Sequence, residues 1–95
     1  MPDRMSLRVI TYDIADNKRR RRVAAILEAR AARVQDSVFE ARLTTAAATA
    51  LLAEINRETG RGDSVRIYAV PDSALTRCRE IGGPEIAGGG RYWLA

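Results

Sequence analysis

A single carboxylate, Asp13, stands in an apolar run that is followed at once by a block of positive charge. The run covers residues 7–14 and has the composition of a buried strand. An ionised carboxylate at the end of such a strand is costly unless a metal ion, a cation or water compensates it. We therefore interpret Asp13 as the candidate catalytic and metal-binding residue, with Mg²⁺ as the candidate cofactor. The structural alternative is that Asp13 pairs with a local arginine or caps the following helix.

The chain offers little else that could complete a metal site around Asp13. It contains no histidine, which excludes histidine ligands, histidine acid–base catalysis and Ser–His or Cys–His triads. Asp16 lies three residues further on, but it is the expected N-cap of the next helix. Proteins often hold Mg²⁺ with one or two carboxylates together with waters and substrate oxygens. The catalytic interpretation therefore requires a two-fold dimer that brings two copies of Asp13 together.

Residues 18–22 place five consecutive cations in the first turns of the expected helix. At about 100° per residue, these side chains point around the whole circumference and cannot share one face. They also repel one another and oppose the helix dipole, which favours anions at this end. Helix N-terminal amides and arginine forks both bind phosphate, so a polyanion would relieve this repulsion. The sequence favours such a phosphate site over the alternative, which is an ordinary solvated basic surface.

The composition describes one small basic domain. The 95 residues are 46% hydrophobic, carry a net charge of +4 and include sixteen basic residues, of which all but Lys18 are arginine. A core of this size is small, so association with a second copy would add stability. A basic surface suits nucleic acid, and arginine makes forked contacts with phosphate that lysine cannot make. Genomic base composition explains the arginine excess equally well.

The single cysteine, Cys78, excludes an intrachain disulfide and a thiolate metal site, which fits a reducing cytoplasm. No apolar run approaches the length of a membrane span, and the N-terminus lacks the apolar core of a signal peptide. We therefore expect a cytoplasmic protein with no membrane partner. Residues 1–95 are expected to form one domain, with residues 1–5 as an N-terminal extension and residues 82–95 as a C-terminal segment.

Hydrophobic periodicity predicts an α+β fold. Strands are expected at residues 6–14, 34–43 and 64–70, and a detached last strand at 91–94. Helices are expected from Asp16 to about residue 32, and from Thr44 or Thr45 to a C′ glycine at Gly60. The second helix should bury Ala48, Leu51, Leu52 and Ile55. Residues 72–81 should form a short helix or turn.

The region at residues 34–43 breaks strict alternation, so we expect a bend near Ser37 and can count the region as two short strands. The order then matches the ferredoxin-like βαββαβ pattern, with an extra C-terminal strand. Both faces of the first strand are largely apolar, which favours a sheet that packs on a partner. Ser37 has no histidine to activate it, so it is a candidate hydrogen-bond donor to phosphate. Phe39 is most simply a core residue.

Three stretches together resemble the second CRISPR-associated (Cas) protein family. They are Tyr12, Asp13 and Ile14; then Arg20, Arg22, Val23 and Leu27; and then residues 33–40, with the sequence RVQDSVFE. The resemblance covers residues 6–70 well and the C-terminal part loosely. The glycine that often precedes the second strand of that family is absent, and Ala31 and Ala32 stand there. The first helix is therefore expected to run on or to end less sharply.

The resemblance implies a ferredoxin-like homodimer, packed through its sheets, that acts in CRISPR spacer acquisition. By position, the metal-binding aspartate of the family falls on Asp13. The resemblance and the basic block together predict a nucleic-acid-binding set, which consists of Tyr12, Arg19, Arg20, Arg22, Arg33, Ser37 and Phe39.

Three hypotheses for the function stay open. The first is a Mg²⁺-dependent endonuclease that cuts phosphodiester bonds in RNA or DNA, as some members of the family do. The second is a non-catalytic DNA-binding adaptor that bridges CRISPR integrase dimers and docks the integrase through residues 91–95. The third is a ferredoxin-like module that binds a metabolite, which predicts no salt-sensitive binding of nucleic acid.

Overall fold

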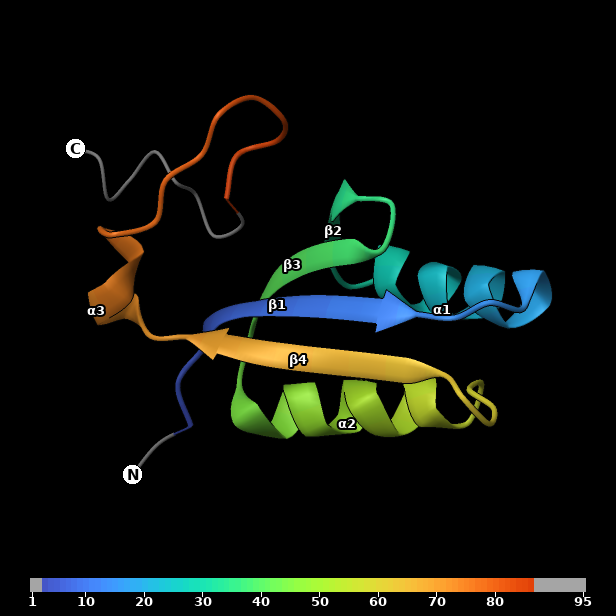
Figure 1. Cartoon of the computed structure of the whole chain (residues 1–95). Helices are drawn as coiled ribbons and strands as arrows, with labels where there is room; N and C mark the ends of the chain where they lie inside the picture. Colours follow the sequence, from blue (N-terminus) through green and yellow to red (C-terminus); the bar gives the residue numbers. More distant parts are fainter. Residues whose placement is uncertain (1–2, 87–95) are drawn as a thin grey trace.

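The elements of the chain follow the predicted order. A computed structural model describes residues 3–86. Its elements are β1 (Ser6–Asp13), α1 (Asn17–Glu28), β2 (Ala32–Gln35), β3 (Val38–Leu43), α2 (Thr45–Asn56), β4 (Ser64–Val70) and α3 (Asp72–Leu75) (Figure 1). The first six form the βαββαβ pattern, so the α+β ferredoxin-like prediction is confirmed. The predicted strand at residues 91–94 lies outside the described residues.

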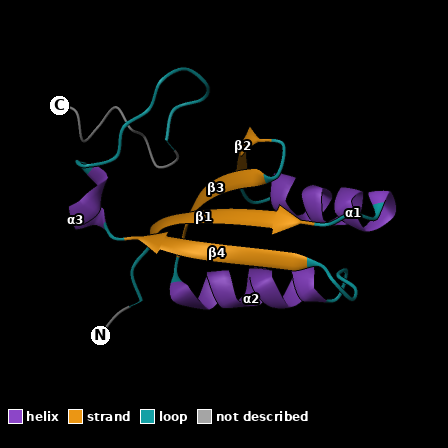
Figure 2. Cartoon of the chain, in the orientation of Figure 1, coloured by secondary structure: helices purple, strands orange, loops and turns teal. Residues whose placement is uncertain are grey.

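Four antiparallel strands form one sheet in the order β2–β3–β1–β4 (Figure 2). The predicted division of the second extended region is confirmed, because Asp36 and Ser37 form a turn between β2 and β3. The register of this pair shifts between Arg33 and Gln35. The central strand β1 ends at Asp13, which lies opposite Ser64 on β4. The candidate catalytic residue is thus at one end of the sheet.

Both long helices pack against the same face of the sheet. The hydrophobic core cluster draws on β1, α1, β3 and α2, and includes Ile10, Tyr12, Val23, Leu27, Phe39, Leu51 and Ile55. On the other face, Leu7 and Val9 line a depression together with residues of the chain beyond α3. Figure 1 shows this orange-to-red part of the chain on the side away from α2. Leu7 is only 2% exposed, so burial of this end of β1 needs no partner chain.

The two long helices begin where the sequence predicts. Asp16 caps α1, and its carboxylate accepts a hydrogen bond from the Arg19 N–H at 2.8 Å. Thr44 caps α2, and its hydroxyl oxygen accepts one from the Ala47 N–H at 3.0 Å. Each cap satisfies a backbone donor that has no partner inside the helix.

The N-terminal extension adds a further cap to α2. The Asp3 carboxylate accepts the N–H groups of Thr45 and Ala46, both at 2.9 Å. These hydrogen bonds, that of Ala46 first, lower the pKa of Asp3. No acidic residue of α2 itself lies in its first turn, so Asp3 supplies the negative charge that the helix dipole favours there. Residue 3 is therefore part of the folded domain.

The first helix is shorter than predicted. It ends at Glu28, and the expected extension to about residue 32 is wrong. The N–H groups of Arg30 and Ala31 both donate to the Leu27 carbonyl, at 3.0 and 2.7 Å, which closes the helix with a tight turn and no glycine. The strand β2 then starts directly at Ala32.

Two predictions for α2 are also wrong. The helix ends at Asn56, so Gly60 is not its C′ residue, and Gly60 has no positive φ. Leu52 is 41% exposed, whereas Ala48, Leu51 and Ile55 are buried as predicted. None of the helices within residues 3–86 has both the length and the apolar character needed to cross a bilayer.

Candidate nucleic-acid interface

A depression of about 280 Å³ lies where the first turns of α1 meet the β2–β3 turn, beside the end of β1. Its lining consists of Tyr12, Arg20, Arg21, Ala24, Arg33, Asp36 and Ser37. Three guanidinium groups and one carboxylate give this lining a net positive charge. Of the predicted nucleic-acid-binding set, the structure brings together Tyr12, Arg20, Arg33 and Ser37. We call this feature the basic depression.

Arg20 is held against the loop that follows Asp13. Its guanidinium donates to the carbonyls of Ile14 and Ala15, both at 3.1 Å, and to the side chain of Asn17. A guanidinium has five N–H donors, so these contacts leave others for a phosphate. Arg20 therefore fixes the loop after Asp13 and places a positive charge in the basic depression.

Arg33 is held by three kinds of contact. It donates to the Asp36 carbonyl at 2.6 Å and forms an ion pair with Glu28 of α1 at 3.1 Å. Its guanidinium carbon also lies 4.8 Å from the centre of the Phe39 ring, in a cation–π arrangement. The ion pair is exposed and contributes little by itself. The hydrogen bond and the ring together orient Arg33 beside the β2–β3 turn.

Phe39 packs in the core against Tyr12 and Arg33, two residues that line the basic depression. Its side chain is 0% exposed, and its ring centre lies 6.2 Å from that of Tyr12. The Tyr12 hydroxyl in turn donates to the Asp36 carbonyl at 3.1 Å. Phe39 has no exposed surface in this chain, and its predicted contact with nucleic acid stays a prediction. It is a core residue on which Tyr12 and Arg33 rest.

Arg19 is engaged inside the fold, away from the basic depression. It forms a two-pronged contact with the Asp63 carboxylate, at 2.8 and 3.3 Å. This contact comes first among the causes that lower the pKa of Asp63 and raise the pKa of Arg19. Asp63 also accepts the Gly60 N–H at 2.7 Å, and its side chain is 3% exposed. The binding role predicted for Arg19 is untested, and its observed role is to join α1 to the turn before β4.

Gly60 packs closely against the Arg19 side chain that makes this contact. A Cβ atom there would lie 3.0 Å from the Arg19 guanidinium carbon, closer than ordinary van der Waals contact. A side chain at residue 60 would therefore require the Arg19 guanidinium to shift by a few tenths of an ångström. The glycine serves a tertiary contact, in place of the helix end predicted from the sequence.

The remaining arginines of the block divide between two flanks of α1. Arg22 lies 3.9 Å from Glu58, in the turn after α2, and its side chain is 62% exposed. Its predicted binding role also stays a prediction. Arg21, which belongs to the predicted basic block but not to the predicted nucleic-acid-binding set, lines the basic depression with Ala24. Arg21 and Ala24 are three residues apart and so share a helix face, which is the signal that could have identified Arg21.

Asp13 is exposed at the end of β1, and its side chain forms no hydrogen bond or ion pair with another described residue. The cap of α1 is Asp16, so the structural roles considered for Asp13 are not observed. Within residues 3–86, no three His, Cys, Asp or Glu side chains are grouped so as to hold a metal ion. An exposed, unpaired carboxylate suits Mg²⁺ as one ligand, with other ligands from water, substrate or a second copy.

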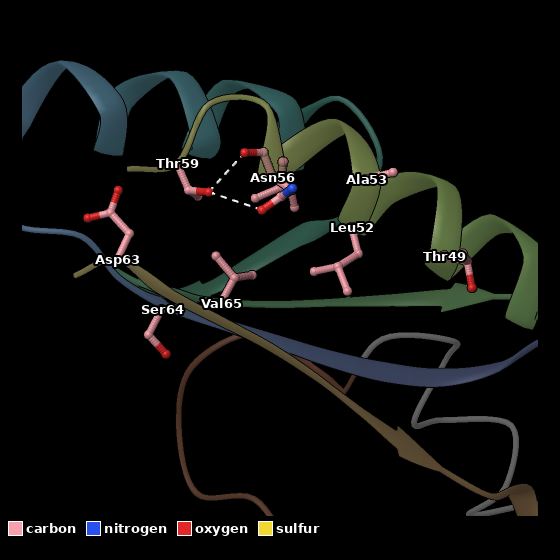
Figure 3. A pocket seen from close by; sticks show the side chains of 9 residues that line it. Thr49, Leu52, Ala53, Asn56, Thr59, Asp63, Ser64 and Val65 are labelled. Atoms are coloured by element: carbon pink, nitrogen blue, oxygen red, sulfur yellow. Dashed lines mark hydrogen bonds between the residues drawn. The ribbon is translucent and has the colours of Figure 1, made fainter. Parts of the chain in front are cut away.

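A larger depression, of about 630 Å³, lies between α2 and β4 (Figure 3). Leu52 and Val65 point into it, and the Thr59 hydroxyl donates to the Asn56 carbonyl at 2.9 Å beside it. Its lining among the described residues contains no lysine or arginine. This larger hollow therefore lacks the charge that a phosphate site needs.

The fold and the basic depression define a class of small ferredoxin-like proteins with an acid at the end of β1 and a basic first helix. Residues 5–78 match the sequence model of the family described as CRISPR associated protein Cas2. The chain belongs to the Cas2 family. The predicted resemblance is thus confirmed.

Individual relatives agree with this assignment. The chain is 36% identical over 87 residues to the CRISPR-associated endoribonuclease Cas2 2 of Synechocystis sp., covering 86% of this chain and 90% of that protein. It is 44% identical over 62 residues to the CRISPR-associated endoribonuclease Cas2 of Mycobacterium tuberculosis. That match covers 65% of this chain and spans only 55% of the Mycobacterium protein.

Solved structures show the same fold. A hypothetical protein from Thermus thermophilus superposes with a TM-score of 0.75 and 34% identity, over 85% of this chain and 96% of that one. A chain of a partial Cas6-RT-Cas1–Cas2 complex superposes with a TM-score of 0.72 and 27% identity, over 87% of this chain and 92% of that one.

Proposed function

We propose that this chain is a CRISPR-associated endonuclease of spacer acquisition that cuts phosphodiester bonds as a Mg²⁺-dependent homodimer. The observation that carries the proposal is Asp13, an exposed carboxylate without a partner among the described residues, next to a loop that Arg20 holds by its carbonyls. The names of the relatives, which state an endoribonuclease, support the activity. RNA and DNA are both retained as substrates, because contacts to the phosphate backbone carry no sequence information.

The alternation of side chains along β1 supports the homodimer. Successive residues of a strand point to opposite faces, so Asp13 shares a face with Val9 and Thr11, whereas Tyr12 faces the helices. The chain beyond α3 lies over the other end of this face, beside Leu7 and Val9. A second copy that packs on the free end, with its two-fold axis beside Asp13, would bring the two Asp13 side chains toward each other.

The residues of the chain have separate parts in this proposal. Asp13 from each copy would hold Mg²⁺, which when bound activates water and stabilises charge on the phosphate. Arg20 and Arg33 bind and orient the nucleic-acid backbone through their remaining N–H groups. Tyr12 and Phe39 keep Arg33 and the β2–β3 turn in place. Ser37 lies at the basic depression, where its hydroxyl can donate to a phosphate oxygen.

The experiment that tests the activity compares Asp13→Asn with Asp72→Asn. Both variants lose one exposed carboxylate charge, but Asp72 lies on α3 and pairs only with Arg42 at 3.5 Å. We expect Asp13→Asn to abolish Mg²⁺-stimulated cleavage of labelled RNA and DNA while light scattering still shows a dimer. Asp72→Asn should cut like the wild type. If Asp13→Asn cuts at the wild-type rate, Asp13 is not the metal ligand and the activity lies elsewhere.

A second candidate function is a non-catalytic DNA-binding adaptor that docks a CRISPR integrase. The observation that favours it is the structural match to a chain of a partial Cas6-RT-Cas1–Cas2 complex. The adaptor predicts that Asp13→Asn preserves spacer acquisition in cells, whereas charge reversal by Arg20→Glu abolishes it. Loss of acquisition with Asp13→Asn would instead favour the enzyme. The cytoplasmic location stays a prediction.

A further inference from the structure

Arg21 differs from the other two arginines of the basic depression in having no partner. Arg20 donates to two loop carbonyls, and Arg33 donates to a carbonyl and pairs with Glu28. Arg21 is exposed, and its side chain forms no hydrogen bond or ion pair with any of residues 3–86. Its five N–H donors are therefore all available to a ligand.

The surroundings of Arg21 are unfavourable to a cation in the free protein. The first turn of α1 contains no acidic residue, and Arg20 and Arg33 line the same depression. Like charges that line one depression repel, and among the described residues of the lining the only acidic one is Asp36. A phosphate group in the basic depression would replace this repulsion between guanidinium groups with attraction, because each guanidinium can donate two parallel hydrogen bonds to phosphate oxygens.

We propose that Arg21 is a phosphate-binding residue of this protein and supplies the basic depression with its third, unengaged guanidinium. The inference rests on the proposed nucleic-acid function and selects, from the basic block at residues 18–22, a residue to which that function gave no individual role. The ligand is a backbone phosphate of single-stranded or duplex nucleic acid. Arg22, the next residue, lies on the other flank of α1 near Glu58 and is not part of this contact.

The test measures binding of a fluorescein-labelled, single-stranded RNA of mixed sequence by fluorescence anisotropy at several salt concentrations. Divalent metal is left out so that cleavage does not change the probe. The variants are Arg21→Ala, Arg21→Lys and, as a matched control, Arg57→Ala. Arg57 is an exposed arginine at the end of α2, outside the basic depression, so its loss changes the net charge equally.

For Arg21→Ala we expect the slope of log affinity against log salt to fall by about 0.7, the value for one lost contact to single-stranded nucleic acid. The same loss weakens binding by roughly fivefold to tenfold at low salt. Arg21→Lys should restore the slope and regain only part of the affinity, because lysine keeps the charge without the fork. Arg57→Ala should keep the wild-type slope.

The assay distinguishes failure of the Arg21 assignment from failure of the proposed nucleic-acid function. If the wild type binds RNA with a salt-dependent affinity and Arg21→Ala behaves like Arg57→Ala, the assignment of Arg21 is overturned and the proposed function stands. If the wild type shows no salt-dependent binding of RNA, and none of duplex DNA in the same assay, both proposals are overturned.

Discussion

Replacing Phe39 tests whether the core beneath the basic depression sets the geometry above it. Phe39 is fully buried, packs against the Tyr12 ring and lies under the Arg33 guanidinium. Two substitutions separate its effects. Phe39→Leu keeps most of the buried volume but removes the aromatic ring, whereas Phe39→Ala removes the volume as well.

The magnitudes follow from these contacts. Loss of an aromatic pair costs about 0.5–1.5 kcal/mol, and loss of a cation–π contact at a partly exposed site costs about 0.5–1 kcal/mol. Phe39→Leu should therefore lower the free energy of unfolding by about 1–2.5 kcal/mol. Phe39→Ala also leaves a cavity, and such changes cost about 3–5 kcal/mol. Since small domains are stable by only about 5–15 kcal/mol, the leucine variant should still fold.

The assay pairs urea unfolding, followed by far-ultraviolet circular dichroism, with the salt dependence of RNA binding. We expect Phe39→Leu to shift the unfolding midpoint without changing the m-value. We also expect weaker RNA binding, because Arg33 loses the ring that orients it.

Two results would refute this reasoning about Phe39. If Phe39→Leu has the wild-type midpoint, the ring contacts with Tyr12 and Arg33 contribute nothing. If Phe39→Leu is destabilised as expected but binds RNA with full affinity, the orientation of Arg33 does not depend on the ring.

Two further predictions concern stability. The folded pKa of Asp63 lies below its ordinary value of 3.8, so the stability that this group contributes is present above that pH and is lost as pH falls through the lowered pKa. Urea midpoints measured over this acid range should fall for the wild type and change less for Asp63→Asn; equal slopes would contradict the role of the Arg19 contact. Thr44→Ala removes the N-cap of α2 and should cost about 1 kcal/mol of unfolding free energy, measured by urea unfolding at neutral pH. An unchanged midpoint would show that Asp3 caps this helix alone.

Features of the fold that depend only on residues close together in the sequence were predictable. The strand Ser64–Val70 and the caps at Asp16 and Thr44 occur where predicted, because alternation and capping are set within a few residues. The end of α1 at Glu28 was missed, because a tight turn onto the Leu27 carbonyl replaced the expected glycine. A local sequence pattern does not determine the residue at which a helix ends, because the tertiary structure selects among several possible endings.

The candidate site was predictable in composition but not in arrangement. The block at residues 18–22 had to spread around α1, yet which arginine would lie in a depression depended on distant partners. Asp63 holds Arg19, and Glu58 lies near Arg22, both more than thirty residues away in the chain. Gly60 was assigned to a helix end because its contact with Arg19 is invisible in a linear sequence.

The placement of Asp13 and the basic depression on different faces of the sheet separates their contributions. Asp13 points to the face away from the helices, whereas Arg20, Arg21 and Arg33 line a depression on the helix side. Groups that share no partner act nearly additively, so removing Asp13 should change cleavage but leave the salt slope of binding intact. Removing Arg21 should change the slope whether the protein is an enzyme or an adaptor. We therefore expect binding to depend on the arginines of the basic depression and cleavage to depend on Asp13 as well, so that Asp13→Asn distinguishes the enzyme from the adaptor.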